Sequence, residues 1–299
     1  MRVQAKSKFE SKPELKVGRK ATIQVNQLNY SIANNDLLKQ VSCRFETGKI
    51  HAILGQNGAG KSTLLGCLSH EVFPSQGHIL WNDEDLSLLS YTDLARQRAV
   101  LSQSQELAFS FTVQELIELG EEVQQRSQKE ARSVVETVLK VCDMTQLRHR
   151  DYLTLSGGEQ KRAQLARVLA QIWPENYGLN EIECHAAPLE KNDAFAGLWL
   201  FLDEWTAGLD IKHQQRLGRY FKQWAKQGLG IIMVLHDISF AAQLANRCLI
   251  LKGGRVFANG SPNETLTQVS LQTSMEMSVR VETDFESGHP LIYPLLESF

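Results

Sequence analysis

Residues 55–63, GQNGAGKST, constrain the fold more than any other part of the chain. They match the pattern G-x-x-x-x-G-K-[ST], and they stand between a short apolar run (50–54) and a helix-compatible segment that begins at Lys61. A strand, a glycine-rich loop and a helix in this order aim backbone N–H groups and the positive end of the helix dipole at one point, where phosphate oxygens can bind. The feature predicts an α/β protein with a largely parallel sheet.

The residues of this loop have distinct expected tasks. Glycines let the backbone curl toward phosphate oxygens, the Lys61 ammonium can reach the β- and γ-phosphates of a nucleotide, and the Ser62 hydroxyl can bind Mg²⁺. The alternative is a glycine-rich turn that binds nothing, and the flanking strand and helix argue against it. The loop residues expected to contact a nucleotide are Gly55, Asn57, Gly58, Ala59, Gly60, Lys61, Ser62 and Thr63.

The composition is that of a globular protein. Of 299 residues, 42% are apolar, which suffices for a full core and excludes general disorder. No uncharged apolar stretch approaches the roughly 18 residues of a membrane-spanning helix. The 32 Lys and Arg residues are balanced by 34 Asp and Glu residues, so the chain lacks the basic field of a nucleic-acid-binding protein.

The cysteines and the first residues indicate the cellular compartment. Five cysteines are scattered without a Cys-x-x-Cys pair, so we expect neither a disulfide framework nor a zinc site, and an intracellular protein is favoured. Residues 1–20 are basic but have no apolar stretch, which is unlike a secretory signal. They are expected to form a flexible basic tail, with binding to anionic lipid as the alternative.

Hydrophobic periodicity divides the rest of the chain. Residues 21–30 alternate like a half-exposed strand, residues 86–170 have mainly helical spacing, and the apolar runs 198–202 and 230–235 are typical of parallel strands covered on both faces. The other expected elements are a strand at 37–45, helices at 113–119, 131–141, 163–173 and 214–226, and a hairpin at 247–258 that turns at Gly253 and Gly254.

Two further patterns carry candidate chemistry. Asp203 and Glu204 end the run 198–202, and such a pair can hold Mg²⁺ and activate water as a general base, although acidic residues also end strands without any such role. The sequence LSGGEQ at 155–160 predicts a helix capped by Ser156, with Glu159 completing a capping box. A capped helix start with two glycines can also bind an anion.

The ordered set GQNGAGKST, Gln103, LSGGEQ, LFLDE, GLD and His236 resembles the ATP-binding subunits of ABC transporters, over about residues 21–265. The resemblance implies an α/β fold of the P-loop NTPase type: an ABC nucleotide-binding domain with a RecA-like core, an antiparallel β subdomain and a helical signature subdomain at about 86–170. It leaves 1–20 as a tail, 174–197 as an insertion and 266–299 as a C-terminal extension.

The resemblance also implies a head-to-tail homodimer with two ATP molecules between the subunits. Each γ-phosphate would meet the P-loop of one subunit and the LSGGEQ motif of the other, and hydrolysis would depend on closure. It implies catalytic roles for Lys61, Glu204 and His236, Mg²⁺ contacts for Ser62, Gln103 and Asp203, and nucleotide contacts for Tyr30, Gln103, Ser156, Gly157, Gly158, Glu159 and Asp210. Gln103 would also connect to the permease, Asp210 would lie at the dimer contact, and Tyr30 would stack on adenine.

The chain departs from the family pattern in the sequence DEWTAGLD. Trp205 stands where proline usually follows the Asp-Glu pair, so we expect an altered loop toward the dimer contact. Gly208 precedes Leu209-Asp210 where alanine is commoner, which affects the expected stiffness of that loop. The catalytic pair itself is intact, which favours a hydrolysing enzyme over a nucleotide-locked switch.

The substrate is indicated by resemblance alone. Because no membrane segment is expected in this chain, two separate permease subunits should carry the substrate, with a periplasmic binding protein acting indirectly and the ATPase lying on the cytoplasmic face of the bacterial inner membrane. Residues 94–103, 108–120 and 162–173 resemble importers of iron complexes and cobalamin, and most closely the haem importer ATPases. Cys184 and His185 of the insertion are candidate iron ligands, although such a pair in a polar loop commonly binds nothing.

Three alternatives stay open. The same motor could serve ferric siderophore or cobalamin import. A non-transport ABC protein of DNA repair or translation would be expected to carry paired cassettes or basic surfaces, which this chain lacks; no nucleic-acid partner is expected. A nucleotide-dependent module without hydrolysis is disfavoured by Glu204 and His236.

Overall fold

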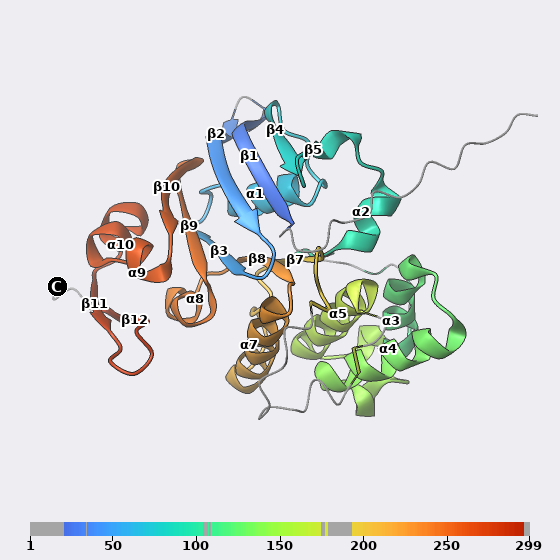
Figure 1. Cartoon of the computed structure of the whole chain (residues 1–299). Helices are drawn as coiled ribbons and strands as arrows, with labels where there is room; N and C mark the ends of the chain where they lie inside the picture. The colour runs from blue at the N-terminus through green and yellow to red at the C-terminus, as the bar shows by residue number, and fades with distance from the viewer. Residues whose placement is uncertain are drawn as a thin grey trace, which may run out of the picture.

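The computed structural model describes residues 21–33, 35–103, 107, 109–174, 177–178 and 193–295. Its centre is a six-stranded sheet in the order β10-β9-β3-β8-β7-β6, in which only the β9–β10 pairing is antiparallel (Figure 1). The strands are β3 (Ile50–Gly55), β6 (Arg98–Leu101), β7 (Trp199–Asp203), β8 (Gly230–Val234), β9 (Arg247–Lys252) and β10 (Arg255–Gly260). The predicted parallel sheet and the hairpin turning at Gly253 and Gly254 are confirmed.

The continuous apolar runs form strands because both faces of this sheet are covered. In β7, Leu200 and Leu202 belong to one core cluster, whereas Trp199 and Phe201 belong to the cluster on the other side. The first face is packed by α5 (Gly157–Ile172), α7 (Ile211–Lys226) and α8 (Ile238–Leu244). Burial of both faces explains why these strands show no polar alternation.

A second, antiparallel sheet lies beside the other face, in the order β2-β1-β4-β5. Its strands are β1 (Thr22–Ile32), β2 (Asn35–Glu46), β4 (Gln76–Trp81) and β5 (Glu84–Asp85). Ile23 of β1, Leu64 of helix α1 (Lys61–Leu68) and Phe201 of β7 share one core cluster. This sheet and α1 therefore pack as a layer on the central sheet.

The region expected to be helical contains a strand. It holds η1 (Leu86–Leu88), α2 (Tyr91–Gln97), α3 (Val113–Glu121), η2 (Glu122–Gln124), α4 (Gln128–Val141), η3 (Thr145–Leu147), η4 (Tyr152–Thr154) and α5. The helical interpretation is wrong at Arg98–Leu101, which forms β6 and pairs with β7. A four-residue strand directly after a helix is too short to interrupt a helical periodicity, so the sequence pattern concealed it.

The C-terminal residues form a compact addition to the core. It comprises α9 (Pro262–Thr265), α10 (Gln268–Met275) and a hairpin of β11 (Val279–Thr283) with β12 (Pro290–Pro294). Leu271, Val279 and Ile292 belong to the large core cluster that covers the central sheet. In Figure 1 this part lies beside β9 and β10, at the opposite end of the molecule from α3 and α4.

Two aromatic residues of the segment at 174–197 are buried. Tyr177 and Phe195 are 3% and 1% exposed, and their rings pack together with Trp173 of the core, with centroids 5.0–5.9 Å apart. Within the segment that the resemblance leaves as an insertion, these two residues therefore belong to the core, whereas Asp193 and Ala196 are exposed. Cys184 and His185 lie outside the described residues.

Three of the four described cysteines are buried. The four described cysteines are free, and burial raises the thiol pKa of Cys67, Cys142 and Cys248 to about 12.

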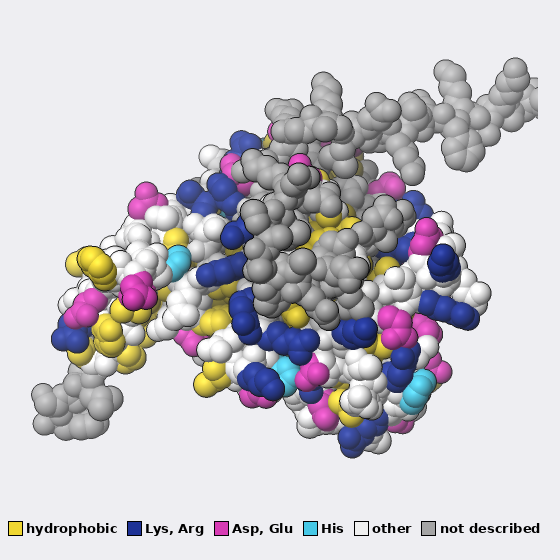
Figure 2. All heavy atoms as spheres, turned by 60° about the horizontal axis from the view of Figure 1, so that its bottom comes forward, with side chains coloured by type: hydrophobic (Ala, Val, Ile, Leu, Met, Phe, Trp, Pro, Cys, Tyr) yellow, Lys and Arg dark blue, Asp and Glu magenta, His cyan; other side chains and the backbone are white. Residues whose placement is uncertain are grey.

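Lys and Arg side chains run across the middle of the face in Figure 2, with Asp, Glu and His side chains among them toward the lower right. Within the described ranges, no helix combines the length and apolar character needed to cross a bilayer.

We predict opposite effects of alanine at two buried helical glycines. A Cβ on Gly120 of α3 would lie 2.1 Å from the Arg167 carbonyl oxygen of α5, whereas a Cβ on Gly218 of α7 would meet its nearest atom, in Phe240, at 3.4 Å. Gly120→Ala should therefore lower the free energy of unfolding by about 1–3 kcal/mol. Gly218→Ala should leave it unchanged or raise it by up to about 1 kcal/mol, because alanine favours helix. Urea unfolding measures both, and equal destabilisation would contradict the close α3–α5 packing.

Candidate active site

The candidate residues lie at one edge of the central sheet. Neighbouring parallel strands run in the order β3-β8-β7-β6, so their carboxyl ends share that edge. The glycine-rich loop follows β3, His236 follows β8 by two residues, Asp203 ends β7, and Gln103 follows β6 by two residues. Four segments far apart in sequence thus meet at the position where open α/β sheets bind ligands.

The glycine-rich loop has a conformation that side chains would prevent. Gly55, Gly58 and Gly60 have φ values of +148°, +77° and +95°. A Cβ on Gly60 would lie 2.5 Å from the Leu37 carbonyl oxygen. Helix α1 begins after Gly60 without a side-chain cap, so its first N–H groups are left for an anion.

Lys61 lies across the loop. Its Nζ donates hydrogen bonds to the carbonyl oxygens of Gly55 and Gln56, both at 3.0 Å, and the residue is only 6% exposed. Burial lowers the pKa of Lys61, and the nearby carboxylates of Glu204 and Asp203 oppose that shift. The loop therefore presents a partly desolvated cation where phosphate would bind.

Asp203 and Ser62 form a pair of oxygen donors. The Ser62 hydroxyl donates to Asp203 Oδ1 at 3.2 Å, and Asp203 is 7% exposed. Burial raises the pKa of Asp203, and the charge of Glu204 adds to that shift, whereas the Ser62 hydrogen bond and the charges of Lys161 and Lys61 oppose it. A hydroxyl and a carboxylate side by side suit a hard cation such as Mg²⁺.

Lys161 is a residue that the sequence analysis missed. It lies in the first turns of α5, and burial lowers its pKa while Asp203 and Glu204 act against that shift. Its signal in the sequence was its place directly after LSGGEQ. The carboxylates of the site thus face two partly buried lysines, one on α1 and one on α5.

Glu204 joins three of the segments. Gln103 Nε2 donates to Glu204 Oε2 at 2.9 Å, and His236 Nε2 lies 2.6 Å from Glu204 Oε1. The Glu204 side chain is 19% exposed and that of His236 is 48% exposed. Glu204 also has a φ of +48°, a left-handed conformation that non-glycine residues rarely adopt. Its carboxylate is therefore fixed from both sides and remains within reach of water.

The capping box predicted at the start of α5 is confirmed. The Ser156 hydroxyl accepts from the Glu159 N–H at 3.4 Å, and the Glu159 carboxylate accepts from the Ser156 N–H at 2.8 Å. Nothing lies within 4 Å of a Cβ placed on Gly157, whereas a Cβ on Gly158 would lie 2.6 Å from the Gly208 carbonyl oxygen. The start of α5 thus lies directly against residues 207–210.

Asp210 connects this loop to the helical region. Its carboxylate accepts from the His213 N–H at 2.9 Å at the start of α7, and hydrogen bonds from His213 lower the pKa of Asp210. His213 Nε2 lies 3.2 Å from Asp143 Oδ2 in the turn after α4. Asp210 is thus held in place by both its own helix and a neighbouring subdomain.

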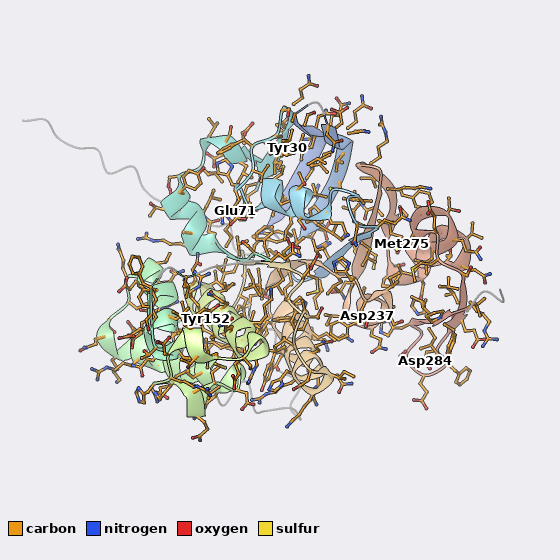
Figure 3. All side chains as sticks on the ribbon, turned by 180° about the vertical axis from the view of Figure 1, so that it is seen from behind. Tyr30, Glu71, Tyr152, Asp237, Met275 and Asp284 are labelled. Atoms are coloured by element: carbon orange, nitrogen blue, oxygen red, sulfur yellow. The ribbon has the colours of Figure 1, made fainter. Side chains whose placement is uncertain are left out.

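Tyr30 lies on β1, half-buried against the core that contains α1. Its strand partner is Leu38 of β2, whose side chain would lie 2.9 Å from a Cβ on Gly60. Figure 3 shows Tyr30 on the antiparallel sheet, well away from Asp237 at the start of α8. Tyr30 therefore belongs to the strand pair that covers the last glycine of the loop.

Known proteins are similar to this chain over most of its length. Residues 38–172 match the family model described as ABC transporter. The hemin import ATP-binding protein HmuV of Escherichia coli O157:H7 is 38% identical over 271 residues, which are 90% of this chain and 98% of that protein. The protein of the same name from Pseudomonas fluorescens Pf0-1 is 37% identical over 270 residues, with the same coverage. The chain belongs to the ABC transporter family. It is one of the family's ATP-hydrolysing subunits.

Solved structures support the fold. The ATP-binding subunit of an ABC transporter superposes with a TM-score of 0.67 at 21% identity, over 85% of this chain and 95% of the other. The cbiO1 protein of Clostridium perfringens, part of the ABC transporter complex cbiONQ, gives a TM-score of 0.66 at 25% identity, over 85% and 94%. The ABC ATPase fold expected from the motifs is confirmed.

In the absence of nucleotide, Asp203→Asn should raise the thermal stability of the chain. Because the pKa of Asp203 is raised on folding, the wild type loses stability as pH rises from the unfolded pKa through the folded pKa, and asparagine does not titrate. We therefore expect Asp203→Asn to have a higher Tm than the wild type at pH 7. The difference in Tm between the variant and the wild type should shrink as the pH falls toward the ordinary aspartate pKa.

Asp284→Asn is the matched control for that measurement. Hydrogen bonds from Ser287 lower the pKa of Asp284, so its contribution to stability is present above the unfolded pKa and is lost as pH falls through the folded pKa. This variant should have a Tm equal to or below that of the wild type at pH 7. A fall in Tm for Asp203→Asn at pH 7 would show that burial does not dominate at Asp203.

Proposed function

We propose that this chain hydrolyses Mg-ATP in a head-to-tail dimer and thereby powers haem import through separate membrane permease subunits. The observation that carries the catalytic part is the placement of Glu204. Its carboxylate is held between Gln103 and His236, one residue after Asp203 and in the same electrostatic neighbourhood as Lys61. This arrangement fits a general base that must keep one orientation beside a phosphate site.

The nucleotide would bind on the loop between β3 and α1. Gly55, Asn57, Gly58, Ala59, Gly60, Ser62 and Thr63 would surround the phosphates, Tyr30 would stack on adenine, and Lys61 would exchange its carbonyl partners for phosphate oxygens. Ser62, Asp203 and Gln103 fit Mg²⁺ because they supply oxygen donors at the same edge. Bound Mg²⁺ would neutralise phosphate charge.

The chain's own residues account for the proton transfer. Glu204 would accept a proton from the attacking water, and its two hydrogen bonds would keep the carboxylate aimed at that water. Lys61 and His236 would stabilise the charge that develops on the transferred phosphoryl group. Because these groups follow different strands of one sheet, their relative positions depend on the packing of that sheet.

The second copy would complete the site. Ser156, Gly157 and Gly158 begin a helix of 16 residues, and nothing crowds Gly157. Such a helix start attracts anions, and we propose that it meets the γ-phosphate held by the partner's loop. Glu159 would keep the Ser156 backbone in place, and Asp210 would lie at the same contact between subunits.

The transported substrate is proposed from relatedness. The relatives from Escherichia coli and Pseudomonas are named for hemin import and match almost their whole length. We therefore propose haem, with a ferric siderophore or cobalamin as the alternative for the same motor. Two permease subunits would bind the ATPase on the cytoplasmic face of the inner membrane, and a periplasmic binding protein would deliver the substrate.

Glu204→Gln should separate binding from turnover. The amide preserves size but cannot accept the proton, so we expect kcat to fall by about 10²–10⁴-fold, while ATP binding persists and a dimer accumulates. Phosphate release and light scattering with Mg-ATP measure the two effects. Glu264→Gln, at a capping box of α9, is the control and should retain wild-type kcat. Unchanged turnover in Glu204→Gln would eliminate Glu204 as the base.

Growth under iron limitation tests the substrate. A strain of the source organism that lacks this gene should fail to grow on haem but should grow on a ferric siderophore as sole iron source. The wild-type gene should restore growth on haem, and the Glu204→Gln gene should not. Loss of growth on the siderophore alone would reassign the substrate and leave the ATPase function intact.

A further inference from the structure

Trp205 lies in the core rather than in an exposed loop. The residue is 0% exposed. Its ring packs edge-on against Phe221 of α7, with centroids 4.9 Å apart and planes at 75°, and lies 5.9 Å from the ring of Phe240 of α8. This departure from the family pattern therefore adds an aromatic ring to the core. The indole packs between α7 and α8.

The backbone around Trp205 is held tightly on the α7 side. The Glu204 carbonyl oxygen accepts from the Ala207 N–H at 3.1 Å, which puts Trp205 at the second position of a turn. Gln214 Nε2 of α7 donates to the carbonyl oxygens of Thr206 and Leu209, at 3.2 and 2.8 Å. The left-handed conformation of Glu204 thus lies at the junction of β7 with an anchored turn.

The other contact of Trp205 leads to His236. Phe240 follows His236 by four residues, and its backbone N–H donates to the Asp237 carboxylate at 2.9 Å in the cap of α8. The indole is therefore wedged between the helix after Glu204 and the helix after His236. The side chains of those two residues meet at 2.6 Å, so the spacing of the two helices governs that contact.

We propose that Trp205 is a positioning residue that fixes the Glu204–His236 geometry through its contacts with Phe221 and Phe240; this inference rests on the proposed role of Glu204 as general base. A proline ring at this position is too small to reach both helices. Among the described residues, the Trp205 Nε1 has no hydrogen-bond partner. The indole N–H therefore carries a desolvation cost, and the contribution of this residue comes from ring size and shape.

Trp205→Leu and Trp224→Leu form a matched pair. Trp224 lies in α7. Like Trp205, it is 0% exposed, and among the described residues its Nε1 has no hydrogen-bond partner. Its ring packs near those of Trp173, Phe195 and Phe221 rather than near Phe240. Both variants should lose thermal stability. Only Trp205→Leu should lower kcat for ATP, by about 10–100-fold, as expected when a catalytic group is displaced by about 1 Å. KM for Mg-ATP should stay close to that of the wild type, because Trp205 belongs to a different core cluster from the one that contains Ala59 of the loop.

Three further variants separate positioning from bulk stability. Trp205→Phe keeps an aromatic ring and should restore kcat to within about threefold of wild type, whereas Phe240→Leu should reproduce part of the loss from the other side of the contact. In a His236→Ala background, Trp205→Leu should lower kcat little further, because residues acting through one contact are non-additive. Trp205→Phe and Phe240→Leu are the milder variants, and they still test the proposal if Trp205→Leu does not fold.

The possible outcomes distinguish a failure of the positioning role from a failure of the proposed function. Equal loss of kcat in Trp205→Leu and Trp224→Leu, or additive effects with His236→Ala, would reduce Trp205 to a structural residue. Wild-type kcat in Phe240→Leu would overturn the inference even if Trp205→Leu does not fold, and unchanged kcat in folded Trp205→Leu would overturn it as well. Glu204→Gln in the same assay tests the proposed function by itself: if that variant loses turnover and the Trp205 series does not, only the positioning role fails.

Discussion

The parallel register of β3, β8, β7 and β6 is the constraint on which the site depends. Asp203 stands opposite Val234, and Ile50 stands opposite Ile231, so the glycine-rich loop, the acidic pair and His236 leave the sheet at matching levels. A slip of one residue in β7 would turn Leu200 and Leu202 to the opposite face and remove Asp203 from Ser62. The same apolar packing that stabilises the core therefore determines the relative positions of the proposed catalytic groups.

The site balances its own charge. Two carboxylates and two lysines lie together in a partly desolvated region, and each pKa shift caused by burial is opposed by the neighbouring opposite charges. Lys61 donates two hydrogen bonds to loop carbonyl oxygens, and Asp203 accepts one from the Ser62 hydroxyl. Each of these contacts is to a neutral group that can be exchanged for a phosphate oxygen or a cation. Such a site is ready for charged ligands without leaving an isolated buried charge.

Sequence reasoning reached the residues whose chemistry is local. The glycine-rich loop, the capping box at Ser156 and the hairpin at Gly253 and Gly254 are each determined by a few adjacent residues, and the structure has them where the patterns indicated. The strand β6 was missed because its identity depends on pairing with β7, more than a hundred residues away. The burial of Tyr177, Phe195 and Trp205, and the approach of Lys161 to Asp203, depend on tertiary packing in the same way. Periodicity within one segment carries no information about such contacts.

The contacts around residues 207–210 show how events at the nucleotide site can reach the helical region. Gly158 at the start of α5 packs on the Gly208 carbonyl oxygen, and Asp210 binds His213, which also contacts Asp143. Arg162 of α5 donates to the Asp143 carbonyl oxygen at 2.7 Å. A displacement of α5 relative to β7 must therefore either carry this loop with it or break several hydrogen bonds at once. Because Gln214 ties the same loop back to the turn that follows Glu204, a continuous set of contacts connects the helical region to the proposed general base within one subunit.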